Sequence, residues 1–377
     1  MQFQLTDEQR DIQMAVSEFV RVEFDDDDIL DMIQNKRFPT KLIKIAGRTD
    51  LIGPHFPEAY GGVDYGLMEK VLIIEGLCRG DSSLGVALGF ADVGSELICK
   101  YGSEDQREKY LKPLAQGKTI FAAVYPGFDG ADENNSVQYL DKDECSGLEL
   151  NGRCERVHNA MNADYFLVPC VPSSDRHAVI AVVNAKTRGV SVIDGGEKLG
   201  LAMMPWGRVV LDNVVADSQD VLGQGQQSDA VFSDVSENIM FRIGAALLGC
   251  AQGAFDAALV YSNQREQFGR KINAFQAIRH KLVEMYRRLQ AARALLYCAA
   301  AAHDNGAVEL HDAVAAKLTV EDAALFITDE SLQIHGGAGY MIETPIEHFF
   351  RDVRVLRAFA GRQTFQRDQI ARCVIDN

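Results

Sequence analysis

Hydrophobic residues recur at helical spacing over the first part of the chain. Thr6 and Gln9 fit a capping box that opens an amphipathic helix through Val20. The apolar positions over 67–78 predict another helix, and Ser103 with Gln106 repeats the capping pattern. The acidic run over 23–28 interrupts the helical pattern and indicates a solvated corner. We therefore expect residues 1–117 to form a helical N-terminal domain.

The hydrophobic period changes to two from about Thr119, which is typical of β-strands. Asn151-Gly152 is in addition the dipeptide that favours a tight hairpin turn. These features predict a small β domain over 118–226. Its expected strands are short, rich in Val, Ile and aromatic residues, and bounded by turn residues: 120–125, 148–150, 165–171, 177–183 and 208–215.

The helical period returns after Gln227 and continues to the C-terminus. Small and apolar residues at helical spacing over 245–261 and 278–302 are typical of long antiparallel helices in a bundle. The predicted fold is mostly α with a central β domain, and the C-terminal helical bundle covers 227–377.

The composition of the chain disfavours several classes of binding partner and a metal site. A formal net charge of -16 disfavours nucleic acid and anionic membranes as partners. The eight cysteines contain no C-x-x-C pair, which favours free thiols in a reducing compartment and makes a metal site improbable. The first residues carry neither a basic nor an apolar leader pattern, so we expect a cytoplasmic protein.

Between the two long helical patterns lies the stretch Arg265-Glu-Gln-Phe-Gly-Arg-Lys-Ile-Asn-Ala-Phe-Gln276. Gly269 breaks the helical pattern, and a guanidinium, two carboxamides and an aromatic ring come close together in sequence. Such groups can clamp a diphosphate and contact a flat heterocycle. The alternative is a plain corner between two helices, because turns often contain Gly and polar residues.

This stretch resembles the R-x-Q-F-G-x-x-I-x-x-F-Q signature of the acyl-CoA dehydrogenase family. A second stretch, Gln333-Ile-His-Gly-Gly-Ala-Gly-Tyr340, is similar to the glycine corner of the same family. The resemblance implies a three-domain fold, FAD as cofactor and an acyl-CoA substrate. It also implies an electron-transfer flavoprotein as redox partner and a dimer, or a dimer of dimers, as the assembly.

The resemblance also shows where this sequence departs from the family. The catalytic glutamate of a Y-E-G-T motif is matched by Ala360, within Phe359-Ala360-Gly361-Arg362, and the position that carries the base in some relatives is Ile239. Neither side chain can accept a proton.

Residues that face the flavin ring in the family are altered as well. Val124-Tyr125-Pro126-Gly127 matches a T-E-P-G segment, and Arg156-Val157-His158-Asn159 matches a W-I-T-N segment. By contrast, the residues that clamp the adenosine diphosphate of a neighbouring subunit's flavin are retained. They are Arg265, Gln267, Phe268, Gln276, Gln333, Gly336 and Gly337.

Three hypotheses follow from this asymmetry. In the first, the chain is a subunit of a hetero-oligomeric acyl-CoA dehydrogenase and completes the flavin site of a paralogous partner. In the second, it is a self-sufficient acyl-CoA dehydrogenase or enoyl-CoA reductase with a relocated base, either Asp92 or His158. Burial would raise the pKa of such a carboxylate, and a neutral imidazole can act near pH 7. In the third, it is a binding or structural paralogue without flavin.

Overall fold

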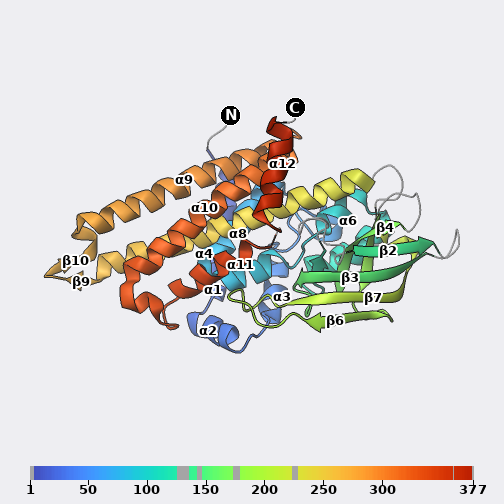
Figure 1. Cartoon of the computed structure of the whole chain (residues 1–377), viewed down its shortest axis with the longest axis horizontal. Coiled ribbons are helices and arrows are strands. Elements are labelled where there is room, and N and C mark those ends of the chain that lie inside the picture. Colours follow the sequence, from blue (N-terminus) through green and yellow to red (C-terminus); the bar gives the residue numbers. More distant parts are fainter. Residues whose placement is uncertain are drawn as a thin grey trace.

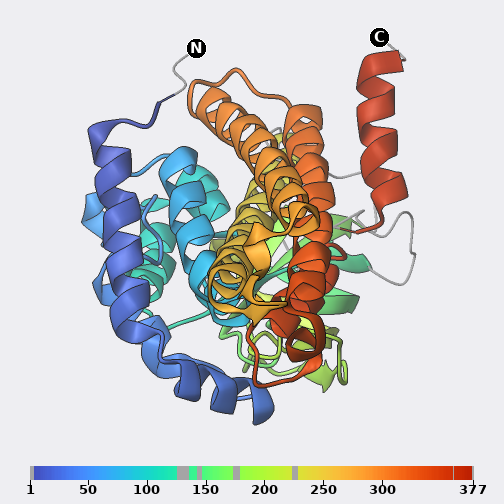
Figure 2. The ribbon, with the colours of Figure 1, turned by 90° about the vertical axis from the view of Figure 1, so that its left-hand side faces the viewer.

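The computed structural model describes residues 4–124, 136–141, 147–172, 179–222, 228–359 and 361–375. Its long axis runs from a β-sheet at one end to a small two-stranded hairpin at the other (Figure 1). Long helices join the two ends, and the N-terminal helices pack along one side of them (Figure 2). The order helical, β, helical confirms the predicted fold class. The exact domain bounds stay a prediction.

The N-terminal helices begin where the sequence offers capping side chains. Thr6 and Ser103 each accept a hydrogen bond from the backbone N–H three residues later, as the two capping boxes predict. Asp25 caps a helix that the sequence analysis did not identify, so part of the acidic run opens a helix. The helices are α1 (Asp7–Glu23), α2 (Asp26–Gln34), α3 (Thr40–Arg48), α4 (Leu67–Gly80), α5 (Ser82–Gly89), α6 (Ser95–Tyr101) and α7 (Glu104–Ala115).

The central sheet is mixed and encloses a hydrophobic core of its own. Along the path β6-β7-β3-β2-β4-β5-β8 the neighbours are antiparallel except β2 and β4, and β1 adds a parallel pairing with β4. The strands are β1 (Phe121–Ala123), β2 (Ser136–Asp141), β3 (Leu148–His158), β4 (Tyr165–Pro172), β5 (Val179–Asn184), β6 (Val190–Asp194), β7 (Trp206–Ala216) and β8 (Val221–Leu222).

The hairpin turn predicted at Asn151-Gly152 is wrong. Strand β3 continues through both residues, and the register with β7 shifts between Leu150 and Gly152. Gly152 has φ 150, a backbone angle that favours glycine. The dipeptide therefore marks a β-bulge, which uses the same conformational freedom as a turn without reversing the chain.

The C-terminal region is built around one long helix. Its elements are α8 (Ser228–Gln264), β9 (Glu266–Gln267), β10 (Arg270–Lys271), α9 (Gln276–Asp304), α10 (Leu310–His335), a 3-10 turn η5 (Gly336–Tyr340), α11 (Ile346–Leu356) and α12 (Gln363–Ile375). A side chain at Gly249 or Gly253 of α8 would collide with the backbone oxygens of Glu75 and Arg79 in α4. These glycines thus let the two helices approach closely.

Among the described residues, Ser236–Gln264 of α8 is the one segment long and apolar enough to cross a membrane. However, 67% of its most apolar window is buried inside the protein, where it packs against α4, α9 and α10. Its apolar character is accounted for by its central place in the core.

A buried polar junction joins all three parts of the chain. His348 Nε2 of α11 lies 2.8 Å from Asp81 Oδ2, an ion pair when the imidazole is protonated, and Asp81 caps α5. Asp352, one turn further along α11, accepts from the Ser82 hydroxyl at 2.7 Å and from the backbone N–H of Leu201. Burial opposes the charge on His348, yet the carboxylate of Asp81 raises its pKa above the ordinary histidine value.

We expect His348→Gln to destabilise the protein in a pH-dependent way. A raised folded-state pKa stabilises the fold fully below the unfolded value of about 6.5, and this contribution is lost as the pH rises through the folded pKa. The variant should lose about 3 kcal/mol at pH 6 and clearly less at pH 9, measured by urea unfolding. The exposed His280→Gln is the control and should show no loss. Equal losses for His348→Gln at both pH values would contradict the assignment.

Candidate functional site

The stretch from Arg265 to Gln276, which resembles the family signature, contains the hairpin at one end of the long axis (Figure 1). Strands β9 and β10 pair in antiparallel register, and their two-residue loop is Phe268-Gly269, with φ 52 and φ 75. Such a loop requires positive φ at both positions, which is strained for a bulky residue such as Phe. The ring of Phe268 is 92% exposed. Folding of this chain alone gives no reason for an exposed phenylalanine in a strained position.

The second motif lies beside the first. Helix α10 ends at His335, and Gly336 follows with φ 57 and ψ -132, a backbone conformation that favours glycine. The His335 ring stacks on Tyr261 of α8, with centroids 4.4 Å apart and planes at 27°. Because Arg265 N–H donates to the Tyr261 carbonyl at 2.8 Å, this stack holds the two motifs together.

The predicted clamp residues are free to contact a ligand. Within the described part of the chain, the side chains of Arg265, Gln267, Gln276 and Gln333 are exposed and make no hydrogen bond or ion pair. A Cβ at Gly337 would meet no atom within 4 Å, so internal packing does not require glycine there. A guanidinium, carboxamides and an open glycine suit the diphosphate of FAD.

Of the two positions that match the family's base, Ile239 is the one that the structure describes, and it lies far from this hairpin. Ile239 is 3% exposed on α8, well before the helix reaches the motif. Ala360 and Tyr125 to Gly127 lie outside the described residues. Phe359, which precedes Ala360, is buried at 6% exposure.

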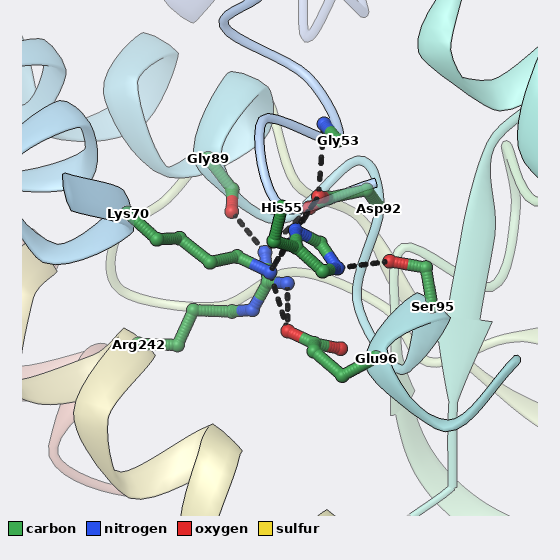
Figure 3. A network of polar contacts seen from close by, with 8 residues as sticks. All are labelled: Gly53, His55, Lys70, Gly89, Asp92, Ser95, Glu96 and Arg242. Atoms are coloured by element: carbon green, nitrogen blue, oxygen red, sulfur yellow. Dashed lines mark hydrogen bonds and ion pairs between the residues drawn. The ribbon is translucent and has the colours of Figure 1, made fainter. Parts of the chain in front are cut away.

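Asp92 lies in a largely buried group of ionisable side chains, which we call the ion cluster: His55, Lys70, Asp92, Glu96 and Arg242 (Figure 3). Arg242 of α8 donates to Asp92 Oδ1 and to Glu96 Oε1, each at 2.5 Å, and also to the Gly89 carbonyl at 2.6 Å. Lys70 of α4 donates to the same Glu96 oxygen at 2.5 Å. The backbone N–H of Gly53 donates to Asp92 Oδ2 at 3.1 Å.

The electrostatics of the ion cluster keep Asp92 ionised. Burial alone would raise the pKa of Asp92, but the charges of Arg242 and Lys70 hold it below its ordinary value. Burial and Lys70 lower the pKa of His55 to about 3, so its imidazole is neutral. The cations Arg242 and Lys70 then face the carboxylates of Asp92 and Glu96. Asp92 is therefore a fully engaged carboxylate, whereas a relocated base would need a free carboxylate with a raised pKa.

His158 ends strand β3 and stacks on Phe359, with ring centroids 3.4 Å apart and planes at 19°. Burial, with Lys198 and Arg156 nearby, lowers the pKa of His158 to about 3. Its Nδ1 atom is buried and has no hydrogen-bond partner in the described part of the chain. The imidazole is therefore neutral at physiological pH.

Asp92 and His158 belong to one continuous set of packed side chains. The Arg242 guanidinium lies 5.9 Å from the centre of the Phe90 ring. Phe90 meets Phe359 edge-on, with centroids 6.2 Å apart, and Phe359 carries His158. Sequence reasoning did not identify Lys70 or Arg242. The available signal was a charged residue inside an otherwise apolar helical pattern.

Within the described residues, no group of three His, Cys, Asp or Glu side chains is arranged to hold a metal ion.

Comparison with known proteins assigns both helical parts of the chain. Residues 6–118 match the acyl-CoA dehydrogenase N-terminal domain, and residues 240–375 match the acyl-CoA dehydrogenase C-terminal domain. The chain is 33% identical to an acyl-CoA dehydrogenase of Bacillus subtilis, over 91% of this chain and 92% of that protein. It is 32% identical to a 3-(aryl)acrylate reductase of Clostridium sporogenes, over 89% of this chain and 90% of that protein.

A solved structure agrees over the full length. The butyryl-CoA dehydrogenase of Megasphaera elsdenii superimposes with a TM-score of 0.92 at 25% identity, and the match covers 100% of both chains. The chain thus belongs to the acyl-CoA dehydrogenase family and is an oxidoreductase of that type, with FAD as its cofactor.

Proposed function

We propose that the chain is a subunit of an FAD-dependent acyl-CoA dehydrogenase and completes the flavin site of a paralogous partner subunit. The reaction of the assembly is α,β-dehydrogenation of an acyl-CoA thioester, with electrons passed to an electron-transfer flavoprotein. When bound, FAD accepts the hydride that leaves the β carbon. The role of this chain is to hold the adenosine diphosphate end of that cofactor.

The length of α8 supports a flavin site shared between two chains, and the apolar side chain at Ile239 supports an unlike partner as the second chain. Ile239 lies on α8 and Arg265 of the clamp directly follows the end of this helix. The part of α8 from Ile239 to Gln264 is about 37 Å long at a rise of about 1.5 Å per residue. This exceeds the distance between ring and diphosphate in one FAD, which are joined only by a ribityl chain. One chain therefore cannot hold the diphosphate and also present its own base position to the same flavin.

The clamp side chains fit such a role by their charge and exposure. Arg265 is an exposed, unpaired guanidinium that can form two parallel hydrogen bonds with a diphosphate. The open backbone at Gly337 gives a ligand close access. Apolar Ile239 and the sequence position of Ala360 support a partner that supplies the carboxylate base.

The second candidate is a self-sufficient enzyme that uses His158. The buried Nδ1 atom of His158 has no hydrogen-bond partner among the described residues, whereas a buried polar atom normally has a partner. This favours a ligand or substrate as the missing partner of His158. The Clostridium sporogenes relative is named a 3-(aryl)acrylate reductase, and this name favours an enoyl-CoA reductase as the form of the second candidate. Against Asp92 as the base stand its ion pairs with Arg242 and Lys70.

We expect Arg265→Ala to weaken FAD binding to the assembly about tenfold or more, since a hydrogen bond to a charged group contributes about 1.5–3 kcal/mol. Flavin absorbance after gel filtration, normalised to protein, measures the loss. The control is Arg48→Ala, which removes an exposed arginine on α3. Full flavin retention by Arg265→Ala would overturn the proposed clamp.

His158→Gln separates the two candidates. If a partner supplies the base, turnover by the assembly should change less than about threefold, and its pH profile should keep its shape. If His158 transfers the proton, turnover should fall by about 10² or more, because general acid–base catalysis contributes at least this much. Steady-state kinetics from pH 5 to pH 9 provide the measurement, and a loss of this size would favour the self-sufficient enzyme.

A further inference from the structure

We propose that His335 is a positioning residue of the flavin clamp: its stack on Tyr261 holds the glycine corner at Gly336 and Gly337 at a fixed distance from the hairpin. Both parts of the clamp can then contact one adenosine diphosphate. This inference rests on the clamp role in the proposed function and deepens it. The clamp residues are the groups that meet the cofactor, and His335 acts through them by fixing the backbone that carries them.

The clamp is divided between two segments of the chain, residues 265–276 and residues 333–340. Among the described residues, no hydrogen bond, ion pair or ring contact joins one segment directly to the other. The Arg265 N–H donates instead to the Tyr261 carbonyl of α8. Directional contacts therefore set the separation of the two segments only through the ends of α8 and α10.

His335 is the residue at which these helix ends meet. It is 5% exposed, and its ring stacks on Tyr261 with centroids 4.4 Å apart and planes at 27°. A Cβ added at Gly339 would lie 3.0 Å from the Cβ of His335, so the 3-10 turn η5 packs against the same residue. His335 therefore ends α10 while it contacts both α8 and η5.

The imidazole of His335 is held in one orientation. Its Nδ1 lies 2.7 Å from the Ser331 carbonyl oxygen, which can only accept a hydrogen bond, so Nδ1 carries the proton. Ser331 in turn donates from Oγ to the Ala254 carbonyl of α8 at 2.9 Å. The last turn of α10 is thus attached to α8 at Ala254 and at Tyr261, about two helical turns apart. Rotating the ring out of the stack would also break its hydrogen bond.

The stack of His335 on Tyr261 is a contact between two uncharged rings. Burial lowers the pKa of His335 below the ordinary histidine value, although the hydrogen bond to the Ser331 carbonyl opposes this shift. The imidazole is therefore neutral at physiological pH. A phenylalanine ring can make the same stack, whereas a leucine side chain fills much of the volume without a flat face. These two substitutions separate stacking from simple filling of the core.

The test compares His335→Leu with His335→Phe in the FAD-loaded assembly. The rise of flavin fluorescence after dilution measures the rate of FAD release. We expect His335→Leu to release FAD about fivefold faster than the unmodified assembly, because an aromatic pair contributes about this factor. His335→Phe keeps the stack and should stay within about twofold. A similar acceleration in both variants, or none in His335→Leu, would overturn the positioning role.

Thermal unfolding of the same assemblies separates positioning from general stability. The control is Phe19→Leu, which removes one ring of an aromatic pair at the end of α1, where the Phe19 and Phe24 centroids are 6.2 Å apart. This variant should lower the unfolding temperature and leave FAD release unchanged. If Phe19→Leu accelerates release as much as His335→Leu does, overall stability is the cause and the inference is overturned.

Tyr261→Leu removes the same stack from the side of α8, where the tyrosine is only partly buried, and it replaces His335→Leu if that variant does not assemble. It should also accelerate release about fivefold. The double variant should be no faster than either single variant, because both substitutions remove one contact. Multiplied effects, about 25-fold together, would reveal two independent contributions and overturn the stack as the cause.

Arg265→Ala distinguishes failure of this inference from failure of the proposed function. Faster release from Arg265→Ala with unchanged release from His335→Leu overturns the positioning role alone. Unchanged release from both variants overturns the clamp, and the inference with it. Flavin bound by an assembly of identical chains, with faster release from His335→Leu, overturns the paralogous partner alone.

Discussion

The length and position of α8 constrain the rest of the molecule. Gly249 and Gly253 let α8 lie close to α4, and its buried face makes it the axis of the helical core. The same helix begins near the sheet and ends at the hairpin (Figure 1). One rigid helix carries Ile239 near one end, and Arg265 directly follows its other end. The position that matches the family's base is therefore held about 37 Å from the hairpin. A single chain thus carries the two positions at opposite parts of its longest helix.

The ion cluster shows how this core tolerates charge. A buried guanidinium without partners would destabilise the fold by several kcal/mol, whereas Arg242 has two carboxylates and a carbonyl in contact. The carboxylates come from the segment after α5 and from α6, and Lys70 comes from α4. The N-terminal helices and α8 are therefore joined by directional bonds as well as by hydrophobic contact, which gives the interface between them a defined geometry.

Local sequence signals predicted the helices well, because capping is decided within four residues. Thr6 and Ser103 act as expected. The hairpin predicted at Asn151-Gly152 was wrong, because the same backbone conformation suits a turn and a β-bulge. The pairing of β3 with β7, which lies far away in sequence, decides between the two. The candidate base Asp92 could be found from its sequence position. Its low pKa depends on Arg242, 150 residues further along, and no local pattern reveals that contact.

The exposed hairpin and the buried region around Ile239 differ in what their side chains contribute to stability. Within the described part of the chain, the side chains of Arg265, Gln267, Gln276 and Gln333 are exposed and make no internal hydrogen bond or ion pair, so their presence costs this chain little stability. A cavity beside Ile239, by contrast, would remove buried contacts without any base to use it. The core near His158 has no such cavity at Phe90 and Phe359, which are both buried and meet edge-on with ring centroids 6.2 Å apart, so their packing stabilises the fold.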